Sequence, residues 1–163
     1  NRPTQLSSWN WSNDLLLTQG ELPVDVALHT QLVRNRLGDR ETVIEFGPVL
    51  QTDLGRTQLN ANLFFERTLA SRSAADPTQL KYQWQARYRW MPGVHFGAQG
   101  FGELGAWDDW SPRQAQSHRA GPAVFGSLRL NEREEVKLQA AWLMGKTYGR
   151  RGHMFSTRLA YDF

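Results

Sequence analysis

The segment KYQWQARYRW, residues 81–90, alternates between two kinds of side chain along its whole length. One parity carries Tyr82, Trp84, Tyr88 and Trp90, with Ala86 among them. The other parity carries Lys81, Gln83, Gln85, Arg87 and Arg89. Successive side chains of a β-strand point to opposite faces, whereas those of a helix repeat every ~3.6 residues. The segment is therefore predicted to be a strand with one aromatic face and one polar, largely charged face.

The same period of two recurs in seven other segments. They span residues 24–32, 42–54, 56–69, 94–104, 120–130, 136–144 and 155–163. Turn-forming residues separate several of them, at Gly38 and Asp39, at residues 53–55, at Pro92 and Gly93, and at Asn131 and Glu132. Helical spacing fits none of the segments well. The sequence thus predicts an all-β fold in which eight clear strands follow one another as antiparallel hairpins.

Strand length separates the two all-β architectures that this pattern allows. In a soluble sandwich the apolar face packs on a second sheet, whereas in a transmembrane barrel it faces lipid and the polar face lines a lumen. The best segments run 10–13 residues, while strands of globular proteins cluster near 5–6. Ten residues tilted by ~40° cover roughly 25 Å, the height of the apolar band of such barrels.

The links between the segments also favour a barrel. Short links at residues 53–56, 91–93 and 131–134 alternate with longer ones at residues 34–40, 70–79, 106–118 and 147–152. Bacterial outer-membrane barrels have tight turns at the periplasmic rim and longer loops at the outer rim. The predicted fold is a transmembrane antiparallel up-and-down β-barrel, either complete or the C-terminal part of a larger one.

Composition narrows the function classes. The chain has no cysteine, which excludes disulfide scaffolds, thiolate zinc sites and cysteine nucleophiles. Its formal charge is +3, and Lys and Arg are spread along the chain, so no nucleic-acid partner is predicted. No window approaches the ~18 consecutive apolar residues of a membrane-spanning helix. The chain opens at Asn1 without a basic-then-apolar leader, which we interpret as a processed or trimmed product.

The final segment, FSTRLAYDF, resembles the C-terminal signature of Gram-negative outer-membrane β-barrel proteins, with Tyr161 and Phe163 as its assembly signal. That resemblance implies recognition by the barrel-assembly machinery and a periplasmic C-terminus. It also implies a location in the bacterial outer membrane, in contact with outer-membrane lipid and lipopolysaccharide.

Residues 21–163 are also similar to the C-terminal part of the phenol-degradation MetA-pathway outer-membrane family. The similarity runs from ELPVDVALHTQL through ETVIEFGPVLQTDLGRTQLNANLFFER to the end of the chain. It rests on hairpin rhythm and carries no catalytic motif. It therefore implies a transport-associated barrel without naming a solute.

Residues 1–23 form an N-terminal segment whose role the pattern leaves open, whereas residues 24–163 hold the predicted barrel strands. Within the N-terminal segment, Trp9, Trp11 and Leu15 alternate with polar residues, so residues 8–18 could be a ninth strand. Because single-chain bacterial barrels have even strand numbers, a ninth strand implies a larger barrel. The alternative is a periplasmic tail or plug beside eight strands. We favour the ninth strand.

The polar parity supplies the predicted wall of the lumen. Its members are Glu45, Glu66, Lys81, Gln83, Gln85, Arg87, Arg89, Glu103, Arg119, Arg129, Lys137 and Arg158. The aromatic residues predicted to face lipid are Tyr82, Trp84, Tyr88, Trp90, Trp142 and Tyr161. Buried charges must be partnered, so one interpretation of the wall is a closed network of ion pairs. The other is a pore whose cations favour anions.

The predicted function is a porin-like or transport-associated barrel that favours small anionic or polar solutes. The first alternative is a closed structural barrel that serves as a membrane anchor or as a partner-binding subunit of a larger membrane complex. A lipid or peptide hydrolase is a distant alternative. No enzymatic activity, catalytic residue, cofactor or metal is predicted.

Two groups of residues in the sequence could carry chemistry. His153 and Ser156 faintly resemble the His/Ser pair of outer-membrane lipid A deacylases, but three residues apart in a strand they face opposite sides. His153 is interpreted as a rim residue.

The long link at residues 106–118 holds Asp108, Asp109 and His118, which are interpreted as soluble loop residues rather than as a protease site. Trp107 and Trp110 flank the acidic pair as interfacial anchors. His29 and His95 point inward, too far apart in the sequence to suggest a metal site.

Overall fold

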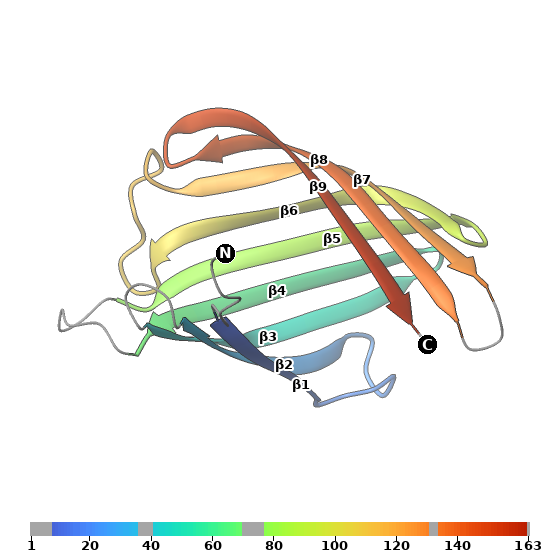
Figure 1. Cartoon of the computed structure of the whole chain (residues 1–163), viewed down its shortest axis with the longest axis horizontal. Helices are drawn as coiled ribbons and strands as arrows, with labels where there is room; N and C mark the ends of the chain where they lie inside the picture. The colour runs from blue at the N-terminus through green and yellow to red at the C-terminus, as the bar shows by residue number, and fades with distance from the viewer. Residues whose placement is uncertain (1–7, 36–40, 70–76, 131–133, 163) are drawn as a thin grey trace, which may run out of the picture.

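The computed structural model describes residues 8–35, 41–69, 77–130 and 134–162, which form nine β-strands and no helix (Figure 1). The strands are β1 (Ser8–Leu16), β2 (Asp25–Asn35), β3 (Thr42–Leu54), β4 (Thr57–Thr68), β5 (Gln79–Met91), β6 (Val94–Ala106), β7 (Ser117–Arg129), β8 (Glu135–Thr147) and β9 (Arg150–Asp162).

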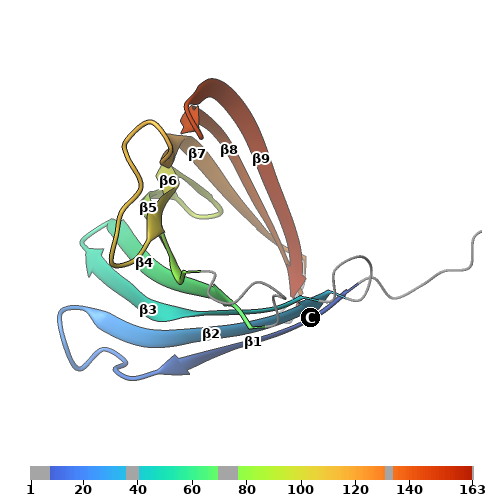
Figure 2. The same cartoon turned by 90° about the vertical axis from the view of Figure 1, so that its left-hand side faces the viewer.

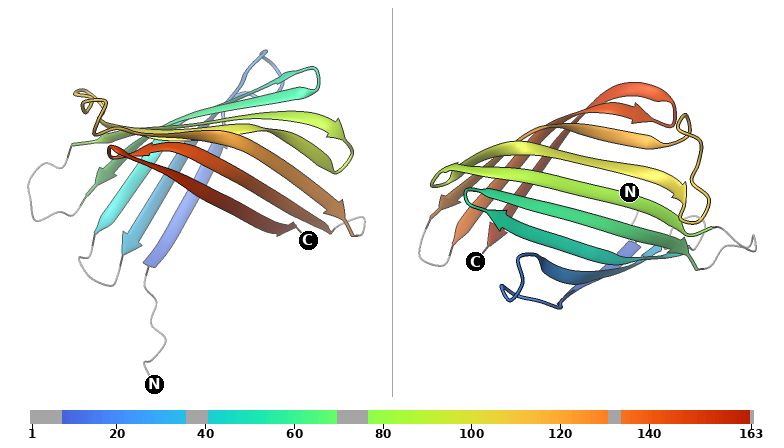
Figure 3. Two further views of the ribbon diagram at one scale, coloured as in Figure 1. Left: turned by 90° about the horizontal axis from the view of Figure 1, so that it is seen from above. Right: turned by 180° about the vertical axis from the view of Figure 1, so that it is seen from behind.

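The nine strands lie in one sheet in the order of the chain, and every neighbouring pair is antiparallel. The predicted all-β, up-and-down antiparallel fold is confirmed. The sheet curls strongly, so that β1 to β3 form one wall and β7 to β9 the other, with β4 to β6 joining them (Figures 2 and 3). No second sheet packs on it among the described residues.

The observed strands follow the predicted segments, and the largest difference is in the last hairpin. β3 spans the predicted residues 42–54, but β9 begins at Arg150 instead of residue 155. Tyr148 and Gly149 form a two-residue link with φ of 46° and 81°, the backbone sign pattern of a type I′ hairpin turn. The predicted longer link at residues 147–152 is therefore wrong, because pairing of Lys146 with Arg151 extends the ladder to the turn.

The other links keep most of the predicted alternation. Gly55 and Arg56 join β3 to β4, and Pro92 and Gly93 join β5 to β6, both at one rim. At the opposite rim a longer link, residues 107–116, joins β6 to β7. The predicted turn residues Gly38, Asp39, Asn131 and Glu132 lie outside the described residues, as do parts of the links at 34–40 and 70–79.

The N-terminal segment contributes a strand. β1 pairs antiparallel with β2 along its whole length, for example Leu15 with Leu28. Consecutive strands reverse direction, so β1 and β9, both odd in the order, run the same way. No pairing between β1 and β9 is found in the described part of the chain, and the sheet is open along these two edges.

The two faces of the sheet differ sharply in exposure. On β8, Ala141 and Leu143 are 2% and 1% exposed, whereas Trp142 between them is 53% exposed. Side chains of strands that are not neighbours meet on the Leu143 side, where Gln139 Nε2 of β8 donates to Gln99 Oε1 of β6 at 2.5 Å. We call this side the concave face and the Trp142 side the convex face.

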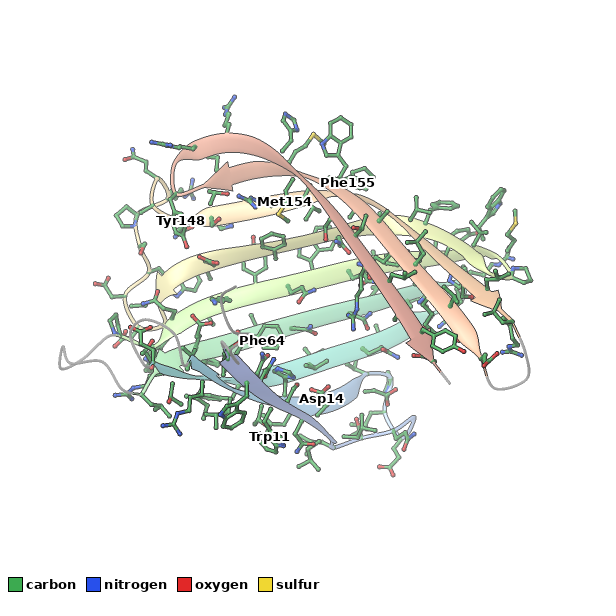
Figure 4. The ribbon with its side chains drawn as sticks, in the orientation of Figure 1. Trp11, Asp14, Phe64, Tyr148, Met154 and Phe155 are labelled. Carbon is green, nitrogen blue, oxygen red and sulfur yellow. The ribbon has the colours of Figure 1, made fainter. Side chains whose placement is uncertain are left out.

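A small apolar core lies on the concave face. It consists of Ala123, Phe125, Ala141 and Leu143, with Phe101 and Met154 packed against it. Figure 4 shows Met154 beside its neighbour Phe155, which belongs to the convex face and is 72% exposed. The core therefore occupies only the part of the trough that β6 to β9 enclose.

Two Gly-Pro pairs mark irregular points in the sheet. A Cβ added to Gly47 would stand 1.8 Å from the Leu63 carbonyl oxygen, and one added to Gly121 would stand 1.9 Å from the Trp142 carbonyl oxygen. The following residues, Pro48 and Pro122, have no N–H to donate, and regular pairing with the next strand lapses at both places. Both glycines therefore allow a close approach of backbones that no other residue permits.

Candidate functional site: the concave wall

The register places all twelve predicted wall residues on the concave face. Direct cross-strand pairs join Glu45 to Glu66, Gln85 to Gln99, Arg129 to Glu135, and Gln139 to Arg158. The others follow by the period of two along the strands: Lys81, Gln83, Arg87, Arg89, Glu103, Arg119 and Lys137. The structure thus brings these residues together on one wall, and their lining of a water-filled lumen stays a prediction.

The charges on this wall are segregated. On β1 to β4 the concave face carries five carboxylates and no Lys or Arg, the carboxylates being those of Asp14, Asp25, Glu45, Asp53 and Glu66. On β5 to β9 it carries three carboxylates, of Glu103, Glu135 and Asp162, and eight Lys or Arg side chains, of Lys81, Arg87, Arg89, Arg119, Arg129, Lys137, Arg150 and Arg158. The formal sums are 0 − 5 = −5 and 8 − 3 = +5, so the described wall is balanced overall and only its β5 to β9 part is basic.

An ion-pair network crosses the acidic part of the wall. Lys81 Nζ lies 2.5 Å from Glu66 Oε2, and Glu66 stands directly opposite Glu45. His29 lies between two further carboxylates, with Nδ1 at 2.5 Å from Asp14 Oδ1 and Nε2 at 3.9 Å from Glu45 Oε1. Lys81 and Glu66 therefore partner each other, and the His29 contacts are ion pairs when its imidazole is protonated.

Two arginines of the basic part lie over aromatic rings instead of carboxylates. The Arg87 guanidinium carbon is 5.3 Å from the centroid of the Phe125 ring, and that of Arg119 is 5.9 Å from the Phe101 ring. Cations placed over ring faces in this way are held by the ring quadrupole. Arg87 Nε also donates to His95 Nδ1 at 2.7 Å, while Arg119 donates to Thr147 Oγ1 of the neighbouring strand β8 and to Met154 Sδ of β9.

Sequence reasoning missed Phe101 and Phe125, although a signal for them was present. Phe101 shares its parity with Gln99 and Glu103, and Phe125 shares its parity with Arg119 and Arg129. A strict period of two places both rings on the polar face. They were missed because the predicted wall included polar residues only, whereas parity also places these two rings on it.

A cavity of about 340 Å³ opens on the basic part of the wall, between β5, β7, β8 and β9. Its lining includes Arg87, Phe125, Glu135, Lys137, Arg158 and Asp162. Lys137 is engaged by two carboxylates there, Asp162 and, at 3.3 Å, Glu135. Such a volume is at the lower end of the range for small-molecule sites.

The predicted lipid-facing aromatic residues lie on the convex face. Trp90, Trp142 and Tyr161 are half exposed, at 51%, 53% and 50%. The ring of Tyr82 leans across β6, where a Cβ at Gly102 would come within 2.5 Å of it, and its hydroxyl reaches His118 Nδ1 at 2.7 Å. The rings of Trp84 and Tyr88 also lean towards β6, over Gly100 and against Phe96 respectively. Phe163, the terminal half of the predicted assembly signal, lies outside the described residues.

The structure places two candidate histidines on strands and corrects the predicted position of His118. His118 belongs to strand β7 and not to the link before it, and Nε2 of its ring is 2.8 Å from Gln116 Oε1. His153 is the fourth residue of β9, close to the turn at Tyr148 and Gly149, and lies on the convex face with its ring 5.7 Å from that of Trp142. Ser156 pairs with Ala141 of the concave face, so His153 and Ser156 point to opposite sides as expected.

The remaining loop candidates are dispersed. Asp108 and Asp109 are exposed in the link at residues 107–116, and His118 is committed to Tyr82 and Gln116. Trp110 forms an isolated bridge with Gly105, and the Trp107 ring is 6.5 Å from that of Phe65. Within the described residues no three His, Asp or Glu side chains form a group that could hold a metal ion.

None of the described residues belongs to a helix that is long and apolar enough to span a membrane. Comparisons of the chain with protein-family models, with curated proteins and with solved structures found no match. The resemblances to outer-membrane barrels and to the MetA-pathway family therefore stay predictions.

Proposed function

We propose that this chain forms part of an integral outer-membrane β-barrel, porin-like or transport-associated, with the concave face turned to a water-filled lumen. The observation that carries this proposal is that apolar and polar side chains occupy the opposite faces from those they occupy in soluble proteins. Large apolar side chains stand on the open convex face, whereas the polar ones line the concave side. Val124, Leu138, Phe155 and Leu159 are between 50% and 72% exposed there.

The extent of the convex apolar surface supports lipid as its neighbour. Exposed large apolar residues occur on every strand, from Trp11 of β1 to Tyr161 of β9. Soluble monomers rarely expose contiguous apolar patches beyond a few hundred Å². Seven of the nine strands have 12 or 13 residues, which at ~3.3 Å per residue and a ~40° tilt rise about 30 Å. That height matches a hydrocarbon layer.

The strand number supports a barrel larger than these nine strands. β1 and β9 run in the same direction, so an antiparallel seam between them is impossible. An odd number of further strands, from whatever source, would restore antiparallel pairing at both free edges. Barrels of ~8 strands are filled by side chains, whereas markedly larger ones leave space for water.

One observation favours the alternative of a closed structural barrel. The concave core around Phe125 and Leu143 fills part of the trough with apolar side chains. An interior plugged in this way would suit a membrane anchor or a partner-binding subunit. The basic wall and the cavity beside the core are the reasons to place the pore first.

Conductance measurements in planar lipid bilayers distinguish the pore from the closed structural barrel. The folded chain, with its partners if it assembles, should give discrete current steps. In a salt gradient, a preference for anions would indicate that permeating ions follow the basic part of the wall, because the two parts of the described wall sum to zero formal charge. Inserted protein that gives no steps would overturn the pore and leave the closed barrel.

A further inference from the structure

The cavity on the concave wall contains basic side chains that form no ion pair within the part of the chain that the structure describes. Of its three basic side chains, only Lys137 contacts carboxylates, those of Glu135 and Asp162. Arg87 and Arg158 have no ion-pair partner among residues 8–35, 41–69, 77–130 and 134–162. The lining therefore carries 3 − 2 = +1 formal charge, the sum of +2 on the two arginines and −1 on Lys137 with its two carboxylates.

Arg87 is held in position before any ligand arrives. Its Nε–H donates to His95 Nδ1 at 2.7 Å, and its guanidinium lies 5.3 Å from the centroid of the Phe125 ring. No hydrogen bond from its two terminal nitrogens is found within the described residues. A guanidinium fixed at Nε and at its face presents its remaining N–H groups as a fork, the geometry that matches a carboxylate.

Arg158 completes the site from the neighbouring wall. It stands opposite Gln139 on the edge strand β9, and its side chain is exposed, so it can move toward an anion without breaking a contact. The Phe125 ring, 5% exposed, supplies an apolar surface in the same cavity. The volume of about 340 Å³ equals roughly eleven water molecules at ~30 Å³ each.

From this arrangement we infer that the cavity binds a small organic monoanion. Its carboxylate lies between Arg87 and Arg158, and its short hydrocarbon part lies against Phe125. The inference rests on the proposed function in one respect, since the cavity must open to a lumen for a solute to reach it in the membrane. In that setting it is a binding step for anionic solutes on the basic wall.

Calorimetric titration of the whole folded chain in detergent micelles tests the site, with butyrate as the probe and sodium chloride at equal ionic strength as the reference. Arg87→Gln and Arg158→Gln should each weaken butyrate binding by about tenfold or more, because each removes a charge-assisted hydrogen bond to the carboxylate. Glu135→Gln should tighten binding several-fold, since it releases part of the Lys137 charge.

Arg119→Gln is the matched control. Arg119 is also a concave-face arginine over a phenylalanine ring, but it does not line the cavity. Its substitution should change butyrate affinity by less than about twofold. An equal loss in Arg119→Gln and Arg87→Gln would overturn the site in favour of diffuse attraction to the basic wall, and so would unchanged affinity in a folded Arg158→Gln variant. Because Arg158 lies exposed on an edge strand, its substitution leaves the fold intact.

Failure of this site and failure of the proposed function give different results. Conductance without butyrate binding removes the site and keeps the pore. Butyrate binding without conductance keeps the site and removes the pore.

Discussion

Trp142 and Leu143 are adjacent in β8, yet Trp142 is 53% exposed and Leu143 is 1% exposed. The larger aromatic side chain, which would gain more from leaving water, is the one that the fold leaves open. Arg119 and Gln139 share the covered face with Leu143. Exposing Trp142 while covering Arg119 and Gln139 is favourable if the medium on the Trp142 side is less polar than water.

Placing a charged side chain on the convex face should show whether that face is in contact with lipid or with water. Val124 lies near the middle of β7 and is 54% exposed. In a bilayer, Val124→Arg should lower the free energy of unfolding by about 2–4 kcal/mol, the cost of Arg near the midplane of an outer-membrane barrel. In water the same exposed substitution would change it by less than about 0.5 kcal/mol. Denaturant unfolding from lipid vesicles, followed by tryptophan fluorescence, measures the difference.

The control for this experiment is Gln83→Arg, which adds the same side chain to the opposite face. Gln83 is an exposed residue of the concave wall, so this variant should unfold within about 0.5 kcal/mol of the wild type. Equal losses in both variants would mean that the two faces meet the same solvent. That result would refute the proposal that the convex side faces lipid.

Gly97 should tolerate no side chain. A Cβ at this position would stand 1.9 Å from the Ala86 carbonyl oxygen, which is held in the β5–β6 ladder. Gly97→Ala should cost about 1–3 kcal/mol or more, as overpacking does. Gly152→Ala, with nothing within 4 Å of the added Cβ, should be nearly neutral. Thermal melts of the two variants side by side check the contrast, and a stable Gly97→Ala protein would refute the close approach.

Tyr148, in the last hairpin, is expected to ionise at a higher pH than a free tyrosine. The Tyr148 hydroxyl, in the turn between β8 and β9, donates to Glu103 Oε2, and this hydrogen bond raises the pKa of Tyr148 above its ordinary value of 10.0. The folded-state pKa is raised, so the stabilisation is complete below the unfolded pKa and is lost as pH rises through the folded one. Glu103→Gln should bring the pKa of Tyr148 down.

Phenolate absorbance during an alkaline titration reports this directly. The wild-type curve should contain a component above pH 10 that Tyr148→Phe removes. If Glu103→Gln leaves the midpoint of that component unchanged, the hydrogen bond is not its cause.

The alternation of apolar and polar side chains along the sequence predicts much of this fold. The period of two predicted β3 to the residue, because Ile44, Phe46 and Leu50 share one face without interruption. It predicted β9 less well. Gly152 falls within the first half of that strand, and without an apolar side chain there the period is invisible. Only the pairing with β8 extends the strand to Arg150.

The site was less accessible from sequence than the strands were. Alternation gave the face of each wall residue, but a linear pattern does not say which strand lies across the trough from which. The stacking of Arg87 on Phe125 joins β5 to β7 across an intervening strand. The separation of acidic β1 to β4 from basic β5 to β9 likewise follows only when parity is applied strictly to every residue.

The pair of Glu45 and Glu66 should make Lys81 important for stability. The two carboxylates stand directly opposite each other on β3 and β4, an arrangement that is destabilising unless a cation intervenes. Lys81 Nζ lies 2.5 Å from Glu66, and both side chains are about two-thirds covered, at 28% and 31% exposure. Lys81→Gln should therefore lower the free energy of unfolding by roughly 1–3 kcal/mol, between the values for surface and buried pairs.

A double-mutant cycle isolates the repulsion behind that loss. Adding Glu45→Gln to Lys81→Gln should recover at least ~0.5 kcal/mol, whereas Glu45→Gln alone should not stabilise the protein by as much. Lys137→Gln is the comparison, since Lys137 also bridges two carboxylates but is 52% exposed, and it should cost no more than ~1 kcal/mol. Denaturant unfolding of the four proteins of the cycle gives the coupling. If the effects of Lys81→Gln and Glu45→Gln simply add, Lys81 does not screen the two glutamates, and the charges of the acidic wall act independently.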